Sequence, residues 1–223
     1  MTLPPHVDAD LNPEVNADLP KRVRAGLRPA PTTVAHTTLD SPVGELLLLS
    51  DGTALTGLYL APHSDVPARH PQWGRQAAPF PATIAQLQAY FAGDLTEFDV
   101  PLAPIGSAFQ LRVWEALRTI PYGRTASYGQ IATALGNPKA GRAVGLANGR
   151  NPISIIVPCH RVIGASGTLI GYGGGLDRKR TLLALEARVV GQPTELYATT
   201  PRRSATPAAR AAAATGASAT LPI

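Results

Sequence analysis

The sequence predicts a small α/β unit with an antiparallel sheet and one helix, followed by a mostly α-helical unit that contains a helix-turn-helix. Three observations lead to this fold class. Short β-prone runs separated by turn residues fill positions 32–60. An apolar stripe at helical spacing follows at 81–92, and several further stripes, with Gly- and Pro-containing breaks between them, fill positions 107–190. A chain of 223 residues is long enough for two such units.

Residues 1–31 are rich in Pro, Ala, Asp and Arg and show no sustained period, so we expect a disordered leader. The first unit, 32–100, then begins with an antiparallel meander. Asp51-Gly52 between two apolar runs is a strong hairpin signal. The three predicted strands are Thr32–Leu39, Glu45–Ser50 and Ala54–Leu60.

The rest of the first unit combines a loop, a helix and a final strand. Residues 61–79 have the Pro, His, Asp and Gly content of a loop. Pro81–Ala92 is predicted to be helical with Gly93 as its stop, and Leu95–Val100 to add an edge strand. The unit carries no chemical motif. Its histidines are expected at the surface or the core edge: His36, His63 and His70.

The second unit, 101–190, begins after the linker Pro101–Ile105. Ser107 is a candidate N-cap for a helix whose apolar stripe is Phe109, Val113, Trp114 and Leu117. Ser127 then starts a second helix, which Gly136-Asn137-Pro138 ends, and a third follows over Ala140–Asn148. Two short helices joined by a tight turn predict a helix-turn-helix, although an ordinary helical hairpin has the same pattern.

The C-terminal part combines a Gly-rich loop, a helix and a tail. The loop, Gly164–Gly175, contains six glycines but lacks the Gly-Lys-Ser/Thr ending of a phosphate loop. Leu176–Val190 is the last predicted helix. Residues 191–223 are rich in Ala, Thr and Pro and predict a disordered basic tail, whose charge suits salt-sensitive, non-specific binding of a polyanion.

Charge is unevenly divided along the chain. Residues 1–100 hold six Lys/Arg against eleven Asp/Glu, whereas residues 101–186 hold ten against three and residues 187–223 four against one. This asymmetry indicates a polyanionic partner for the second half only, the alternative being a basic face kept for solubility. No secretory signal or membrane span is expected, because the acidic, Pro-containing start lacks an apolar segment.

The only cysteine, Cys159, follows an apolar, β-branched run and lies between Pro158 and His160. We interpret this run as a strand leading to the thiol. A stiff approach to a single thiol followed by His-Arg indicates a positioned nucleophile, the alternative being a buried cysteine that acts as a small hydrophobe. One cysteine excludes an intramolecular disulfide, and no zinc-ligand spacing is present. A thiol that must stay reduced fits the cytoplasm.

The segments around this cysteine resemble the signature of the O6-alkylguanine-DNA alkyltransferases, which repair DNA by a single irreversible transfer. The resemblance is strong over Ser107–Arg188 and loose over Thr32–Asp99. It implies a ribonuclease H-like fold for the first unit and a winged-helix-like fold for the second. The segments that carry it are Ser127-Tyr128, 136–140, 142–145, Asn151-Pro152, 156–162 and 171–176.

The resemblance also implies the chemistry. Cys159 would take the alkyl group from O6-alkylguanine, and possibly O4-alkylthymine, in double-stranded DNA. A Cys159–water–His160–Glu186 relay would remove the thiol proton, with Asn151 supporting the turn and Tyr128 donating to the leaving guanine. The product thioether is stable, so each molecule acts once, as a monomer, without cofactor or metal. From the sequence alone, a solvated helix charge is the favoured interpretation of Glu186.

The predicted DNA contacts centre on a helix of small residues, among them Ala143 and Gly145. Such a helix suits close approach in the minor groove, and the resemblance implies that Arg142 enters the base stack behind a flipped base. A plain phosphate contact is the alternative for Arg142. Tyr172 would form an aromatic wall, backbone groups of Val162 and Gly173 would recognise the base, and Arg161 would be structural or contact a phosphate.

Three other functions fit parts of this pattern. A non-enzymatic lesion binder would flip the base without reacting, but the group that does so lacks the cysteine. A cysteine hydrolase built on Cys159, His160 and Glu186 would need an oxyanion hole and would turn over repeatedly. A helix-turn-helix regulator is disfavoured by the small residues of the third helix, because major-groove readers present several polar side chains.

Overall fold

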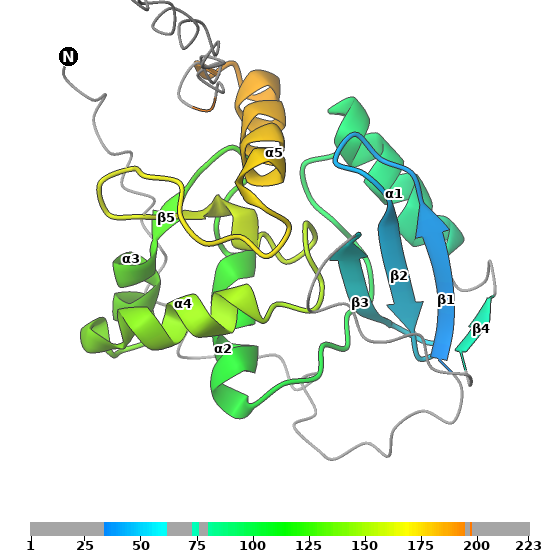
Figure 1. Cartoon of the computed structure of the whole chain (residues 1–223), viewed down its shortest axis with the longest axis horizontal. Coiled ribbons are helices and arrows are strands. Elements are labelled where there is room, and N and C mark those ends of the chain that lie inside the picture. Colours follow the sequence, from blue (N-terminus) through cyan, green and yellow to red (C-terminus); the bar gives the residue numbers. More distant parts are fainter. Residues whose placement is uncertain (1–33, 62–72, 76–79, 195–196, 198–223) are drawn as a thin grey trace, which may run out of the picture.

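A computed structural model of the chain describes residues 34–61, 73–75, 80–194 and 197. The predicted leader, 1–31, and nearly all of the predicted tail lie outside these residues, as do His63 and His70. Figure 1 shows a sheet with helix α1 on one side and a helical unit on the other, with α5 at the top between them. The two predicted units are therefore both present and lie side by side.

The sheet has the strand order β3-β2-β1-β4. Strands β1 (Val34–Leu39), β2 (Leu46–Ser50) and β3 (Leu55–Leu60) pair antiparallel, which confirms the predicted meander. The β2–β3 loop closes because Oδ1 of Asp51 accepts hydrogen bonds from the backbone N–H groups of Thr53 and Ala54, each at 2.9 Å. Gly52 has a φ of 94° in this loop, a conformation that suits glycine.

Two expectations for the first unit are wrong. The predicted loop 61–79 contains strand β4 (Trp73–Arg75), which pairs parallel with β1. Three residues are too few to show strand alternation, so only the open edge of β1 makes them a strand. Conversely, 95–100 forms no strand, because the side-chain amide of Gln86 binds the backbone of Asp99. Its Nε2 donates to the Asp99 carbonyl at 2.9 Å, and its Oε1 accepts from the Asp99 N–H at 2.8 Å. A single bridge, Leu55 to Leu102, comes two residues later.

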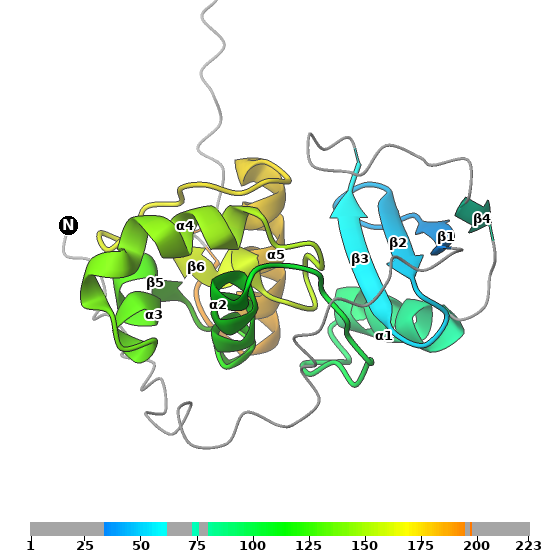
Figure 2. The ribbon, with the colours of Figure 1, turned by 90° about the horizontal axis from the view of Figure 1, so that it is seen from below.

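Helix α1 (Pro81–Ala92) has the predicted bounds and ends at Gly93, whose φ is 89°. It lies along the sheet, as Figure 2 shows from below. Its buried Leu87 and Tyr90 join the sheet residues Leu48 and Leu58 in one hydrophobic core, and that core continues into the helical unit. His36 is half-buried on β1, as expected of a core-edge residue.

In the helical unit, α2 (Ala108–Arg118) and α3 (Tyr128–Ala134) each begin with a capping box. In α2, Ser107 Oγ accepts from the backbone N–H of Gln110 at 3.3 Å and the Gln110 side chain accepts from the Ser107 N–H at 2.8 Å. Ser127 and Gln130 repeat the arrangement for α3. The predicted N-cap at Ser107 is therefore confirmed, as is the start of the second helix at Ser127, which is also an N-cap.

The helix-turn-helix is formed by α3 and α4 (Gly141–Gly149), with one turn of 3₁₀ helix, Pro138–Ala140, between them. Trp114 of α2 lies beneath and donates from its indole N–H to the carbonyl of Ala147 at 2.8 Å. Strands β5 (Ala126–Ser127) and β6 (Val162–Ile163) form a short parallel pair that joins the start of α3 to the segment after Cys159. Helix α5 spans Leu176–Val189.

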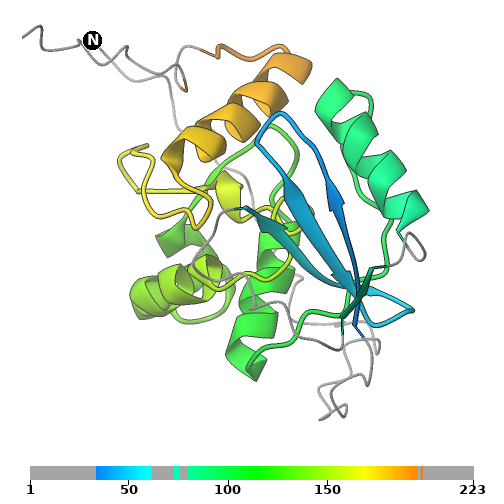
Figure 3. The same ribbon diagram turned by 45° about the vertical axis from the view of Figure 1, so that its right-hand side comes forward.

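The two units are joined through strand β3. The backbone N–H of Leu58 donates to the carbonyl of Pro152 at 2.8 Å, and its carbonyl accepts from Ser154 N–H at 2.9 Å. Figure 3 shows the sheet lying between α1 and the helical unit. Across the part of the chain that the structure describes, no helix is long and apolar enough to span a membrane.

Removing the Ser107 cap should destabilise the protein measurably. In Ser107→Ala the N–H of Gln110 loses its acceptor, which lowers the free energy of unfolding by about 1 kcal/mol. Urea denaturation followed by circular dichroism measures this loss. Ser107→Asp keeps a capping oxygen and should stay near the wild-type midpoint; an Asp variant as unstable as the Ala variant would contradict the cap.

Candidate active site

The segment before Cys159 is a buried turn, so the predicted strand leading to the thiol is wrong. Residues 153–158 form no strand, and Cys159–Arg161 is one turn of 3₁₀ helix. Ile155 is buried with a φ of 71°, which is strained for a β-branched residue. The apolar run that suggested a strand is instead buried around this turn.

Asn151 holds the turn in shape. Its Nδ2 donates to the carbonyl of Val157 at 2.8 Å, and its Oδ1 accepts from the backbone N–H of Ile153 at 3.0 Å. These bonds replace the ladder that a strand would have made. The structure thus places Asn151 against the turn that carries the thiol.

Cys159 is 4% exposed and is a free thiol. Burial raises its pKa, while hydrogen bonding by the Asn151 and Ser154 side chains and the nearby charge of Lys179 act to lower it. Burial outweighs the lowering contributions, so the resting group is a protonated thiol. A proton acceptor must therefore act before this sulfur can attack an electrophile.

The carboxylate of Glu186 lies fully buried near this turn and accepts five hydrogen bonds. Oε1 accepts from Tyr90 Oη and His160 Nε2, each at 2.8 Å, and from Arg161 Nη2 at 3.0 Å. Oε2 accepts from Arg161 Nε at 2.9 Å and from the Gly123 N–H at 3.1 Å. We call these residues the Glu186 cluster: Tyr90, Gly123, His160, Arg161 and Glu186.

Glu186 is ionised in this cluster. Burial alone would raise its pKa, but the charges and hydrogen bonds of His160 and Arg161 outweigh burial and lower the pKa from 4.5 to about 2. The alternative of a solvated helix charge is excluded by the burial of the side chain.

His160 is neutral and presents one nitrogen as an acceptor. Burial lowers its pKa, and Arg161 and Lys179 lower it further, against the opposing effect of Glu186. Since an ionised carboxylate only accepts, Nε2 must carry the proton, which leaves a lone pair on Nδ1. Among the described residues Nδ1 has no hydrogen-bond partner, so this atom can receive a proton.

Arg161 is buried and fully engaged. Besides its two bonds to Glu186, it donates from Nη1 to the carbonyl of Ile120 at 2.6 Å and lies 5.5 Å from the ring centroid of Tyr122. A side chain held in this way supports the structural role that the sequence left open, rather than a phosphate contact.

Lys179 connects the active-site segment to the Gly-rich loop. It is fully buried, and its Nζ donates to the carbonyl of Val162 at 2.5 Å and to that of Ile170 at 2.8 Å. Burial lowers its pKa to about 8, against the raising effect of Cys159. Lys179 thereby links the strand residue Val162 to Ile170, which lies in the loop shortly before Tyr172 and Gly173.

Tyr128 lies at the same loop from the side of α3. Its Oη donates to the carbonyl of Ile170 at 3.3 Å, and burial together with Cys159 raises its pKa, so it remains a donor. The Tyr172 hydroxyl is buried without a partner among the described residues, and burial and Cys159 raise its pKa as well. Gly173, the next residue after Tyr172, is exposed.

Helix α4 presents its small residues beside this region. Arg142 and Ala143 are exposed, and Gly145 lies against the ring of Tyr128, where an added Cβ would be 3.7 Å from two ring carbons. Arg142 is thus the one charged residue of α4, whose other exposed residues are small except for Leu146, which is 67% exposed.

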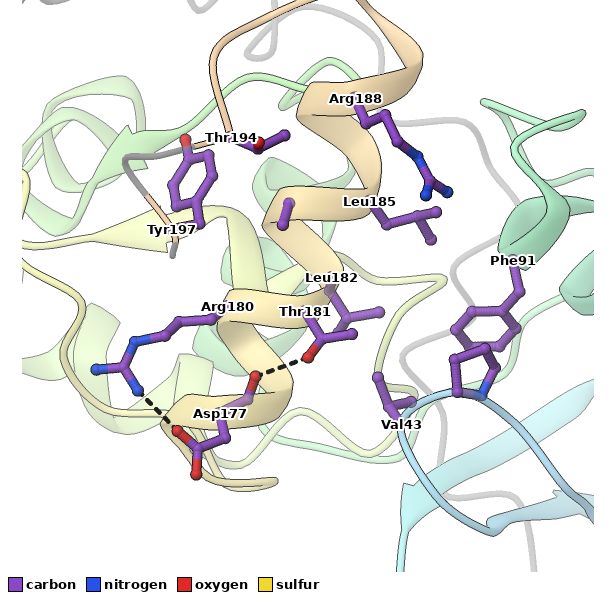
Figure 4. Close-up of a pocket in the computed structure, with 12 residues that line it drawn as sticks. Val43, Phe91, Asp177, Arg180, Thr181, Leu182, Leu185, Arg188, Thr194 and Tyr197 are labelled. Carbon is purple, nitrogen blue, oxygen red and sulfur yellow. Dashed lines mark hydrogen bonds and ion pairs between the residues drawn. The ribbon is translucent and has the colours of Figure 1, made fainter. Parts of the chain in front are cut away.

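A hollow of about 680 Å³ is lined by residues of α5, of the sheet unit and of the segment after α5. Figure 4 shows Leu182, Leu185 and Arg188 of α5 on one side and Val43 and Phe91 of the sheet unit facing them. None of the predicted site residues lines it, so it is not the pocket for a reacting base.

Four side chains that contribute to the site were not predicted: those of Tyr90, Asn148, Ser154 and Lys179. Lys179 had a detectable signal, because Lys179, Leu182, Leu183 and Glu186 recur at helical spacing on one face, and all four are buried. Asn148 is buried with its Nδ2 3.5 Å from the Cys159 carbonyl. Tyr90 lies 96 positions from Glu186, and no local pattern reports such a pairing.

Together, the fold and the site define a helix-turn-helix protein with a buried cysteine beside a carboxylate-bound, neutral histidine. Family models match both units: "6-O-methylguanine DNA methyltransferase, ribonuclease-like domain" over residues 34–104 and "6-O-methylguanine DNA methyltransferase, DNA binding domain" over residues 108–188. The chain belongs to the O6-methylguanine DNA methyltransferase family.

Individual relatives agree with this assignment. The chain is 58% identical over 155 residues to a methylated-DNA–protein-cysteine methyltransferase of Mycolicibacterium paratuberculosis, covering 70% of this chain and 93% of the relative. A Methanosarcina acetivorans protein of the same name is 52% identical, covering 68% and 97%. The structure of Mycobacterium tuberculosis OGT in complex with DNA matches with a TM-score of 0.68 and 55% identity, covering 73% and 98%.

Glu186→Gln should lower stability and flatten its pH dependence. The folded pKa of Glu186, about 2, lies below its ordinary 4.5, so its stabilisation is full above about pH 4.5 and is lost as pH falls towards 2. Removing the charge leaves Arg161 buried and unpaired, which lowers the free energy of unfolding at pH 7 by roughly 3–5 kcal/mol.

Urea denaturation from pH 2 to 7 tests this expectation. Glu115→Gln is the control, because that carboxylate pairs with Arg118 at the surface and its loss should change stability by less than about 1 kcal/mol. Parallel pH profiles for wild type and Glu186→Gln would show that Glu186 is not the ionised centre of the cluster.

Proposed function

We propose that this protein repairs DNA by transferring the alkyl group of O6-alkylguanine in duplex DNA irreversibly to Cys159. The observation that carries the proposal is a buried thiol followed by a neutral histidine whose Nε2 is held by an ionised carboxylate, in a chain of this family. The presence of Cys159 disfavours a lesion binder that does not react. O4-alkylthymine would be a second substrate of the same chemistry.

The reaction needs one proton transfer before attack. The Cys159 proton passes through a water to Nδ1 of His160, and Glu186 stabilises the imidazolium that forms. The thiolate attacks the alkyl carbon; the new S–C bond forms as the C–O6 bond breaks, and its electron pair stays on guanine. Asn151 and Ser154 stabilise the thiolate by hydrogen bonding.

The leaving guanine gains negative charge. Tyr128 stabilises this charge when its hydroxyl donates a hydrogen bond, or transfers its proton, to a ring nitrogen of the guanine. Burial keeps this phenol protonated and available at neutral pH. The thioether that remains on Cys159 does not hydrolyse readily, so each molecule reacts once. No cofactor takes part in this scheme.

DNA is bound through the face of α4. Its small residues, including Ala143 and Gly145, allow the helix to approach the minor groove, and Arg142 enters the stack in place of the flipped base. Tyr172 forms a wall of the base pocket, with backbone groups of Val162 and Gly173 recognising the base. The Mycobacterium tuberculosis relative crystallised in complex with DNA supports this partner.

Arg161 has a structural role, orienting Glu186 rather than contacting a phosphate. The protein acts as a monomer in the cytoplasm, where the single thiol stays reduced.

Cys159→Ser should abolish alkyl transfer while DNA binding remains. The assay uses a duplex oligonucleotide with radiolabelled O6-methylguanine and measures label on the protein, with binding measured by fluorescence anisotropy. Wild type should take up no more than one label per molecule. Label on the Ser variant would refute Cys159 as acceptor, and release of more than one equivalent of product would indicate a hydrolase.

Arg142→Ala should slow the reaction with duplex DNA by on the order of tenfold or more, because flipping costs a few kcal/mol that the inserted side chain offsets. The reaction with the free O6-alkylguanine base should not change. Single-turnover kinetics with both substrates measure the two effects. Arg118→Ala, on α2 and paired with Glu115, serves as the charge-matched control; equal losses on both substrates would exclude a flipping role.

A further inference from the structure

The sheet unit contributes a side chain to the Glu186 cluster. Tyr90, at the end of α1, is completely buried, and its Oη donates to Glu186 Oε1 at 2.8 Å. The ring is held in place by aromatic neighbours, with centroids 5.3 Å from both Phe91 and Phe98. A buried hydroxyl held in this way has no freedom to bond elsewhere.

Tyr90 and His160 share the same oxygen. His160 Nε2 lies 2.8 Å from Oε1, the distance at which Tyr90 also donates. Two donors that share one carboxylate oxygen compete for its electron density. A stronger hydrogen bond from the Tyr90 phenol therefore makes Oε1 of Glu186 a weaker acceptor for the His160 N–H. The phenol can therefore change how strongly Glu186 stabilises the protonated form of His160.

The phenol of Tyr90 is a hydrogen-bond donor at neutral pH. Burial and the charge of Glu186 raise the pKa of Tyr90 well above 10. Tyr90 and Arg161 therefore both donate to Glu186, but only Arg161 also brings a positive charge.

We propose that Tyr90 is a positioning residue for alkyl transfer: it fixes Glu186 and limits the proton affinity of His160. The proposal rests on the function proposed above and extends it, because the ribonuclease-like unit then completes the proton relay. The first unit, which carries no recognisable catalytic motif, thus contributes the Tyr90 hydroxyl to the active site.

Other groups also act on His160, and the effect of Tyr90 must be separated from theirs. Three charged groups act directly on this imidazole: Arg161 of the 3₁₀ helix, and Lys179 and Glu186 of α5. Tyr90 and Tyr122 interact with Glu186 and Arg161 instead.

The test is the pH profile of the single-turnover rate constant with the free O6-alkylguanine base, which removes DNA binding from the measurement. In Tyr90→Phe the carboxylate loses one donor, so it attracts the imidazolium proton more strongly. His160 then stays protonated to higher pH, and the acidic limb of the profile moves up by on the order of one pH unit.

Tyr122→Phe is the matched control. Its ring lies 5.9 Å from that of Tyr90 and against Arg161, but its hydroxyl has no hydrogen-bond partner among the described residues. Phenylalanine keeps the ring, so the acidic limb should stay where it is in wild type. A shift of the same size in this control would overturn the proposal.

Replacing Tyr90 by a monofluorinated tyrosine keeps the shape of the side chain and makes the phenol a stronger donor. The acidic limb should then move to lower pH, opposite to Tyr90→Phe, and this arm remains decisive if the phenylalanine variant does not fold. A lower rate with an unmoved limb in either variant would reduce Tyr90 to a packing residue. Absence of transfer in wild type would instead refute the proposed function itself.

Discussion

The Glu186 carboxylate is the constraint on which the rest of this structure depends. A fully buried negative charge is costly unless every lone pair is met, and here five donors meet it. They come from α1, the turn after α2 and the 3₁₀ helix that carries Cys159. One carboxylate on α5 therefore fixes the positions of elements that lie up to 96 residues apart, and no single element could move without leaving a donor or the charge unsatisfied.

This arrangement explains how a thiol with a raised pKa can react. The imidazole of His160 stays neutral because burial, Arg161 and Lys179 oppose its protonation, yet Glu186 holds the proton on Nε2 and leaves Nδ1 as acceptor. The charge needed for attack is thus created only when the proton moves. A permanently ionised thiolate in the same buried turn would carry the cost of burying a negative charge. Asn151, Ser154 and Lys179 offset only part of that cost.

Several elements could be predicted because their signals are local. The caps at Ser107 and Ser127, the Gly93 stop and the Asp51-Gly52 hairpin each depend on residues within four positions, and all are present. The predictions failed where distant partners decide the backbone. The apolar run before Cys159 forms a turn because Asn151 and β3 bind its backbone. Residues 95–100 form no strand because the Gln86 side chain binds the backbone of Asp99. Trp73–Arg75 is a strand only because it pairs with the edge of β1.

The fold class, the helix-turn-helix, the single thiol and the histidine beside it could be predicted from local signals, because periodicity, capping and covalent adjacency are encoded locally. The folded chain was needed to establish that Glu186 is buried and ionised, that Arg161 faces inward, and that Tyr90 and Lys179 reach the site. The reason is that ionisation and hydrogen-bond pairing depend on the surroundings of a group. Those surroundings are assembled here from segments that meet only in the folded chain.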